Sequence, residues 1–280
     1  MINAKNTAII TYANKNSEEN LEIDFLKSLY TVAHYTGKVI ILNYGISENA
    51  INRIKKMYPV QIVDCCIKTD IFVDRYRDIA SEIENLDNDI STIITMDCGD
   101  VWFQSSLEIM QNIGIDEIWT VMENRIWDED EWALKCINNL VDKDKEYVIE
   151  KLTGTNVRNS GVIVGGKNAI KKLSKKVYHD ILNCGYFYFG IDQIFVNYEI
   201  AKLDVDKRRS LDEIFNYVLI SNQGQFYIID NVVYRNDGNK IVIVHNAGGN
   251  WRLLKRPFTN KWHDTNQYII ENIKKISEEV

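Results

Sequence analysis

The feature that most constrains the fold of this chain is a regular alternation of short apolar runs with helical patterns in its first hundred residues. The apolar runs lie at 7–12, 39–42, 60–63 and 92–96, and the segments with helical spacing lie at 21–35, 47–57 and 70–86. Strands separated by helices of this length form right-handed βαβ units. Strands that are apolar throughout are typical of a sheet covered on both faces. The pattern predicts an α/β fold with a mostly parallel sheet.

Residues that favour helix ends support these boundaries. Gly37 follows the segment 21–35 and is expected to cap its C-terminus. Ser47 is expected to cap the N-terminus of the next helix, and Pro59 lies just beyond its end.

The second half is less regular. Ser105 and Glu108 have capping-box spacing for a short helix that ends near Gly114. The other elements expected in this half are strands at 118–122, 159–166, 226–229 and 241–244, and helices at 167–183, at 192–201 and from 260 onward.

Composition excludes some functions. A formal net charge of -7 argues against a nucleic-acid-binding protein, which normally has a basic surface. The five cysteines form no CxxC pair and are expected to be reduced thiols of a cytoplasmic protein. The N-terminus lacks the pattern of a secretory signal, and no segment approaches the ~18 apolar residues of a membrane span. We therefore expect a cytoplasmic protein, with peripheral membrane association left open.

Two carboxylates follow the fourth predicted strand, in the stretch Asp97-Cys98-Gly99-Asp100. In sheets of parallel strands, ligands bind beyond the C-terminal strand ends. Gly99 tolerates a positive φ, so a turn there could bring Asp97 and Asp100 onto one Mg²⁺ or Mn²⁺ ion. The alternative is that Asp100 only starts a turn and Asp97 is a solvated strand end.

A second candidate ligand, His245, ends the apolar strand 241–244 and precedes the sequence NAGGNWRLLKRP. Histidine is a common metal ligand, the glycines allow close approach to a phosphate, and Lys255 and Arg256 could neutralise it. The alternative is a hairpin turn with a half-buried His245. Because two strands each end in candidate ligands, the combination favours a metal–diphosphate site.

Two further stretches offer polar groups. Asn159 and Ser160 precede an apolar run, where short side chains could hold sugar hydroxyls. Asp192 and Gln193 begin an amphipathic helix. Asp192 is also a good N-cap, whereas Gln193, one residue inside the helix, is less easily explained in that way.

Taken in order, these motifs resemble the GT-A glycosyltransferases, particularly the glycogenin and lipopolysaccharide-galactosyltransferase type. That family has a βαβ nucleotide-binding half, an Asp-x-Asp metal motif after the fourth strand, and a late His-x-x-Gly-x-x-Lys-Pro-Trp motif. Here Gly99 stands where the second aspartate of Asp-x-Asp would fall. The final Lys-Pro-Trp is only approximated by 255–257.

The resemblance implies a single GT-A domain over 1–280, with a nucleotide-binding half (1–104), an acceptor and metal half (105–259) and a C-terminal helix (260–280). It implies transfer of a sugar, expected with retention, from a UDP-sugar to an acceptor hydroxyl with Mn²⁺ or Mg²⁺. The implied metal ligands are Asp97, Asp100 and His245, and Asp192 and Gln193 are the catalytic candidates. The implied donor-binding residues are Thr11, Tyr12, Ala13, Arg75, Asp97, Cys98, Gly99, Asn159, Ser160, Gly248 and Lys255.

Some of these assignments have alternatives. Arg75 could lie on a solvated helix face instead of holding the donor. The tryptophans of 123–132, Trp127 and Trp132, could line an acceptor-side loop or could be the core anchors of an inserted helix. The expected acceptors are glycans, lipid-linked glycans or glycoproteins, as in the synthesis of bacterial surface glycans.

Two rival functions share this kind of sheet. A sugar nucleotidyltransferase usually has a glycine-rich loop after its first strand. This chain has TYANKNSEEN there, which contains no glycine and therefore argues against that function. The other rival is an inactive sugar- or protein-binding module. It stays open because Gly99 stands where the metal motif of the family has its second aspartate.

Overall fold

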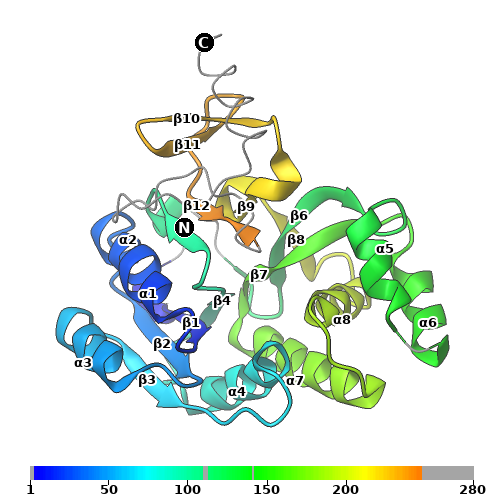
Figure 1. Cartoon of the computed structure of the whole chain (residues 1–280), viewed down its shortest axis with the longest axis horizontal. Helices are drawn as coiled ribbons and strands as arrows, with labels where there is room; N and C mark the ends of the chain where they lie inside the picture. The colour runs from blue at the N-terminus through cyan, green and yellow to red at the C-terminus, as the bar shows by residue number, and fades with distance from the viewer. Residues whose placement is uncertain (1–2, 110–112, 141, 248–280) are drawn as a thin grey trace.

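A seven-stranded mixed sheet forms the centre of the protein (Figure 1). The structure is a computed structural model that describes residues 3–109, 113–140 and 142–247. The strand order is β3-β2-β1-β4-β7-β6-β8, and only β7 among them runs antiparallel to its neighbours. The strands are β1 (Thr7–Ala13), β2 (Lys38–Asn43), β3 (Gln61–Asp64), β4 (Thr92–Met96), β6 (Ile118–Ile126), β7 (Asn156–Gly166) and β8 (Arg208–Leu211). The expected α/β fold with a mostly parallel sheet is confirmed.

Helices cover both faces of this sheet, which explains why its strands are apolar throughout. In β1, Ile9 packs into the core on one face and Ile10 into the core on the other. The first core is covered by the π-helix η2 (Leu21–Leu26), which continues the short α1 (Glu18–Asn20), and by α2 (Lys27–Thr31) and α3 (Glu48–Met57). The second is covered by α4 (Ile71–Asn85), α5 (Glu131–Asn138), α6 (Asp142–Leu152), α7 (Lys167–Cys184) and α8 (Ile191–Ala201).

A smaller sheet lies beyond the C-terminal end of β4 and has the order β5-β12-β9. Its strands are β5 (Val101–Phe103), β9 (Tyr217–Val218) and β12 (Ile243–His245), and the hairpin of β10 (Phe226–Ile229) and β11 (Val232–Arg235) packs beside it. The described residues also contain the short 3-10 helices η1 (Ala4–Asn6), η3 (Leu107–Ile109), η4 (Glu213–Phe215) and η5 (Leu219–Asn222). Because β5 directly follows the acidic loop 97–100, its pairing with β12 brings His245 next to that loop.

The predicted helix 21–35 differs from the observed one. Helical structure begins at Glu18, changes to a π-helix and ends at Thr31. The hydroxyl of Ser28 donates to the carbonyls of Asp24 and Phe25, which competes with regular backbone pairing. Gly37 does not cap this helix. A Cβ there would lie 2.4 Å from the carbonyl oxygen of Ala4, so a close backbone approach explains this glycine.

The predicted cap at Ser47 is confirmed, because its side chain accepts the backbone N–H of Ala50. Asp70 caps the start of α4 in the same way by accepting the N–H of Phe72. Near 105–108 the capping hydroxyl is that of Ser106, which accepts the N–H of Glu108, and not that of Ser105.

The polar stretch after residue 122 is more ordered than expected. The strand β6 continues to Ile126, and α5 and α6 follow. Trp132 lies on α5, which agrees with the alternative of an inserted helix, whereas α6 was not predicted. His245 is the last residue of β12, as expected, although the strand begins at Ile243 and not at residue 241. The predicted C-terminal helix from 260, together with Gly248 and Lys255, falls outside the described residues. Within the described ranges, every helix is too short or too polar to cross a membrane.

Candidate functional site

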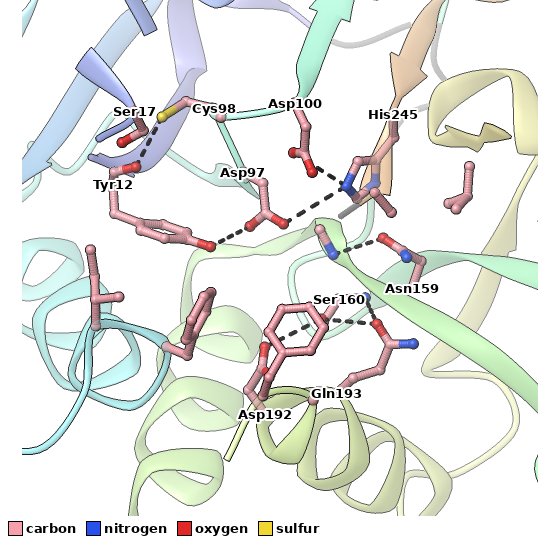
Figure 2. Close-up of a pocket in the computed structure, with 18 of the residues that line it drawn as sticks. Tyr12, Ser17, Asp97, Cys98, Asp100, Asn159, Ser160, Asp192, Gln193 and His245 are labelled. Carbon is pink, nitrogen blue, oxygen red and sulfur yellow. Dashed lines mark hydrogen bonds and ion pairs between the residues drawn. The ribbon is translucent and has the colours of Figure 1, made fainter. Parts of the chain in front are cut away.

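A cavity of about 550 Å³ opens at the C-terminal edge of β1 and β4 (Figure 2). Most of the predicted site residues line it: Tyr12, Arg75, Asp97, Cys98, Gly99, Asp100, Asn159, Ser160, Asp192, Gln193 and His245. Thr11 and Ala13 do not, because both are buried within the sheet and Ala13 points into a hydrophobic core. The prediction that these two residues contact a donor is therefore wrong for their side chains.

The three predicted metal ligands come together in this cavity. One candidate ligand atom from each of Asp97, Asp100 and His245 lies within 4.8 Å of the other two. The imidazole Nε2 of His245 is 3.5 Å from Asp100 Oδ1 and 3.9 Å from Asp97 Oδ2 (Figure 2). Two carboxylates and one imidazole suit a divalent cation such as Mn²⁺ or Mg²⁺. These three ligands therefore fit the expected metal ion.

Backbone hydrogen bonds fix these ligands relative to one another. The N–H of Asp97 donates to the carbonyl of Gly161 on β7 at 2.9 Å, and the N–H of Asn246 donates to the carbonyl of Asp100 at 2.8 Å. Gly99 does not adopt a positive φ, so the loop turns without the left-handed conformation that we expected of it. Asp100 thus reaches the cluster through an ordinary backbone path.

The cluster is electrostatically crowded. Burial raises the pKa of the Asp97 carboxyl, and the nearby Asp100 adds to this while Arg75 and His245 oppose it. Burial works to lower the pKa of His245, but the carboxylates of Asp100 and Asp97 outweigh it, and the net pKa is raised. A bound cation would relieve this crowding of negative charge.

Arg75 connects the cluster to the start of α8. Its guanidinium is buried and donates from Nη1 to Asp97 Oδ1 at 2.7 Å and from Nη2 to Asp192 Oδ2 at 2.5 Å. It also stacks over the ring of Tyr12, whose hydroxyl donates to Asp97 Oδ1 at 2.7 Å. Arg75 therefore does not lie on a solvated face. Tyr12 and Arg75 occupy Asp97 Oδ1, while Oδ2 is the oxygen nearer His245.

The start of α8 contradicts the capping alternative for Asp192. The N-cap position is Gly190, with φ 96, and no side chain caps this end of the helix. The carboxylate of Asp192 instead faces the cavity and pairs with Arg75. The side-chain oxygen of Gln193 accepts both the backbone N–H and the hydroxyl of Ser160 at 3.2 Å.

The side-chain amide of Asn159 makes more hydrogen bonds within the protein than we expected of an amide that binds a sugar. Its Nδ2 donates to Glu123 Oε1 at 2.9 Å, and its Oδ1 accepts from Gly161 N at 2.8 Å and from Asn216 Nδ2 at 2.9 Å. These bonds compete with any sugar hydroxyl for the same amide.

Several cavity residues were missed by the sequence analysis. Polar ones come from the segment after β1, namely Asn14, Asn16, Ser17 and Asn20. Their position beyond a strand end could have indicated them. Within this segment, Asn14 Oδ1 accepts the N–H groups of Asn16 and Ser17 and so holds the turn.

Aromatic side chains line another part of the cavity. Phe72 and Phe189 meet edge to face with centroids 5.7 Å apart, and Arg125 lies 5.2 Å over the ring of Trp132. Trp127 is fully buried in a core, so of the two tryptophans only Trp132 reaches the cavity.

Comparisons with known proteins do not add to this geometry. No protein-family model matches the chain, and a search of curated proteins finds no match to it.

Proposed function

We propose that this protein is a metal-dependent glycosyltransferase of the GT-A type that moves a sugar from a UDP-sugar to an acceptor hydroxyl. The observation that carries the proposal is the cluster of Asp97, Asp100 and His245 beside a cavity that also holds Asp192. Glycans, lipid-linked glycans or glycoproteins as acceptors, and a cytoplasmic location, belong to the same proposal.

The chain's own groups have distinct roles in this proposal. Asp97, Asp100 and His245 would hold Mn²⁺ or Mg²⁺, which supplies charge stabilisation for the diphosphate that leaves with UDP. Arg75 neutralises the half-buried carboxylate of Asp97 and the buried carboxylate of Asp192 together. Asp192 and Gln193 face the position proposed for the transferred sugar. With retention Asp192 orients that sugar, and with inversion it is the candidate base. NMR of the product's anomeric proton distinguishes the two stereochemical courses.

The aromatic part of the cavity is the proposed sugar-contacting wall. Trp132 and Phe189 present flat apolar faces, on which the C–H faces of a sugar ring can stack. Phe189 is 63% exposed, so its ring is accessible to a ligand.

The decisive measurement is calorimetric binding of UDP with and without Mn²⁺. Asp97→Ala and His245→Ala should each abolish the Mn²⁺-dependent binding, because each removes one of three ligands in the cluster. Asp204→Ala is the matched control, since Asp204 is an exposed carboxylate paired with Lys207 outside the cavity. Normal metal and nucleotide binding by either cluster variant would refute that residue's role.

A second assay separates the transferase from its rivals. A transferase should release UDP slowly from at least one UDP-sugar in a Mn²⁺-dependent way, even without an acceptor. UDP binding with no hydrolysis or transfer from a panel of donors would favour the inactive binding module. Neither binding nor release would overturn the proposal.

A further inference from the structure

A chain of buried side-chain hydrogen bonds leads away from His245 on the side opposite the carboxylates. The contact between His245 Nδ1 and Asn216 Oδ1 is 2.9 Å. Asn216 Nδ2 donates to Asn159 Oδ1 at 2.9 Å, and Asn159 Nδ2 donates to Glu123 Oε1 at 2.9 Å. We call Asn216, Asn159 and Glu123 the amide relay. All three are at least 95% buried, and Asn216 is fully buried and does not line the cavity.

The direction of every bond in the amide relay follows from groups that have only one option. Glu123 is ion-paired with Arg125, and a carboxylate can only accept hydrogen bonds. The backbone N–H of Gly161 can only donate, and it donates to Asn159 Oδ1 at 2.8 Å. Both groups require the same orientation of the Asn159 amide, with Nδ2 toward Glu123 and Oδ1 toward Gly161. The usual ambiguity of an amide flip is therefore removed at this residue.

This orientation determines the next two groups. Since Asn159 Oδ1 is an acceptor, Asn216 must turn its donor, Nδ2, toward it. Asn216 then presents Oδ1 to His245, so Nδ1 of a neutral His245 must carry the proton. The lone pair of Nε2 consequently faces Asp100 and Asp97, which is the form of histidine that binds a metal.

The carboxylates alone would favour the opposite tautomer. Without a metal, Asp100 Oδ1 at 3.5 Å would attract a proton on Nε2. The amide relay and the carboxylates therefore compete for the placement of one proton. We infer that Asn216 is a positioning residue that holds His245 in the Nδ1–H tautomer, so that Nε2 is ready to bind a divalent cation. This inference rests on the metal site of the proposed function, and outer partners of this kind commonly orient metal-binding histidines.

The tautomer can be measured directly, without metal or substrate. Nitrogen-15 chemical shifts of the imidazole distinguish a protonated nitrogen from one with a lone pair. The experiment uses the full chain with ¹⁵N-histidine, at a pH where the imidazole of His245 is neutral, and assigns its signals by their loss in His245→Gln. We expect a protonated Nδ1 and an unprotonated Nε2. A protonated Nε2 in the unmodified protein would overturn the inference.

Variants of Asn216 test the cause. Asn216→Leu removes the acceptor, so His245 should change to the Nε2–H tautomer, and affinity for Mn²⁺ should fall about 10- to 100-fold. Asn216→Asp restores an acceptor facing Nδ1 and should return the Nδ1–H tautomer. An Nδ1–H tautomer that persists in Asn216→Leu would refute the role of Asn216.

Asn222→Leu is the matched control, because Asn222 is also a buried asparagine but donates to the backbone carbonyl of Val218 outside the relay. It should leave both the tautomer and the Mn²⁺ affinity unchanged, and a change equal to that of Asn216→Leu would attribute the effect to general loss of packing and overturn the inference. If the unmodified protein shows the Nδ1–H tautomer but binds no Mn²⁺, the metal site of the proposed function fails while the tautomer assignment stands.

Discussion

At the scale of single residues, Asp180 and Glu199 bring two carboxyl groups together between α7 and α8. Glu199 is almost fully buried and pairs with Lys176 and Lys202. Burial, reinforced by the neighbouring Glu199, raises the pKa of Asp180 to about 6. The ordinary pKa of this carboxyl is 3.8. Between pH 3.8 and about 6, the folded protein therefore holds a proton on Asp180 that the unfolded chain releases.

This difference makes stability depend on pH. Between pH 3.8 and about 6 the folded state binds more protons than the unfolded state, so the free energy of unfolding falls as pH rises through this range. Asp180→Asn cannot ionise and avoids this loss. We expect the variant to be more stable than the parent by about 1 kcal/mol at pH 7, after allowance for solvent screening of this partly exposed group.

Urea unfolding of both proteins at pH 7 and at pH 4.5 measures this effect. The advantage of Asp180→Asn should shrink at the lower pH, where the parent carboxyl is already protonated. An advantage that is equal at both pH values would contradict the assignment.

At the scale of elements, strand β7 approaches β12 so closely that a glycine is required between them. A Cβ on Gly161 would lie 2.2 Å from Cε1 of His245 and 2.9 Å from Asn159 Oδ1. Gly99, in the acidic loop, has open space, because its Cβ would meet nothing closer than a contact of 3.8 Å to Ser17. Two glycines of the same cavity thus differ sharply in what they tolerate.

We therefore expect Gly161→Ala to displace His245 and to weaken Mn²⁺ binding at least 10-fold, while Gly99→Ala binds Mn²⁺ nearly as the parent does. Titration followed by electron paramagnetic resonance of free Mn²⁺ measures both. Circular dichroism checks that each variant is folded. Equal affinities for Gly161→Ala and the parent would show that the imidazole is not confined by β7.

The sequence predicted those elements whose local pattern determines them. The strands β1, β2 and β4 lie within two residues of their expected positions, because strands buried on both faces are continuous apolar runs. The direction of β7 could not be predicted, since its apolar pattern is the same whichever way it runs. Short strands such as β9 carry too few residues for any pattern.

The same distinction applies to the site. The meeting of Asp97, Asp100 and His245 was predictable from strand ends that share one edge of the fold. The role of Asp192 was obscured because an aspartate at a helix start usually caps it. The carboxylate of Asp192 instead pairs with the buried guanidinium of Arg75, 117 residues away in the sequence. This ion pair prevails over the local preference of an aspartate to cap the helix. Asn216 carried no signal, because an isolated buried asparagine has no sequence pattern.

At the scale of the whole molecule, Arg75 joins segments from both halves of the chain. It lies on α4 and holds the carboxylate after β4 and the one on α8. Removing the guanidinium leaves two carboxylates without their cation. We expect Arg75→Met to lower the free energy of unfolding by about 3 kcal/mol, the low end for a broken buried pair, because Asp97 is 24% exposed.

Adding Asp192→Asn should recover part of this loss, with a coupling energy of about 1–3 kcal/mol in a double-mutant cycle. Chemical denaturation of the four proteins provides the measurement. Arg53→Met, which breaks a surface pair with Glu22, is the control and should cost less than about 1 kcal/mol. Strictly additive effects of the Arg75 and Asp192 substitutions would refute the coupling.

The placement of His245 on β12 also has a consequence for how the protein is made. Asp97 and Asp100 emerge early in synthesis, but their third partner belongs to a strand that pairs with β5 only after most of the described chain has been synthesised. Closing the loop between these segments has an entropic cost, which tends to slow the formation of contacts between distant parts of a chain. A partly synthesised or misfolded chain therefore lacks the complete cluster. Cation binding would then report that the fold has closed.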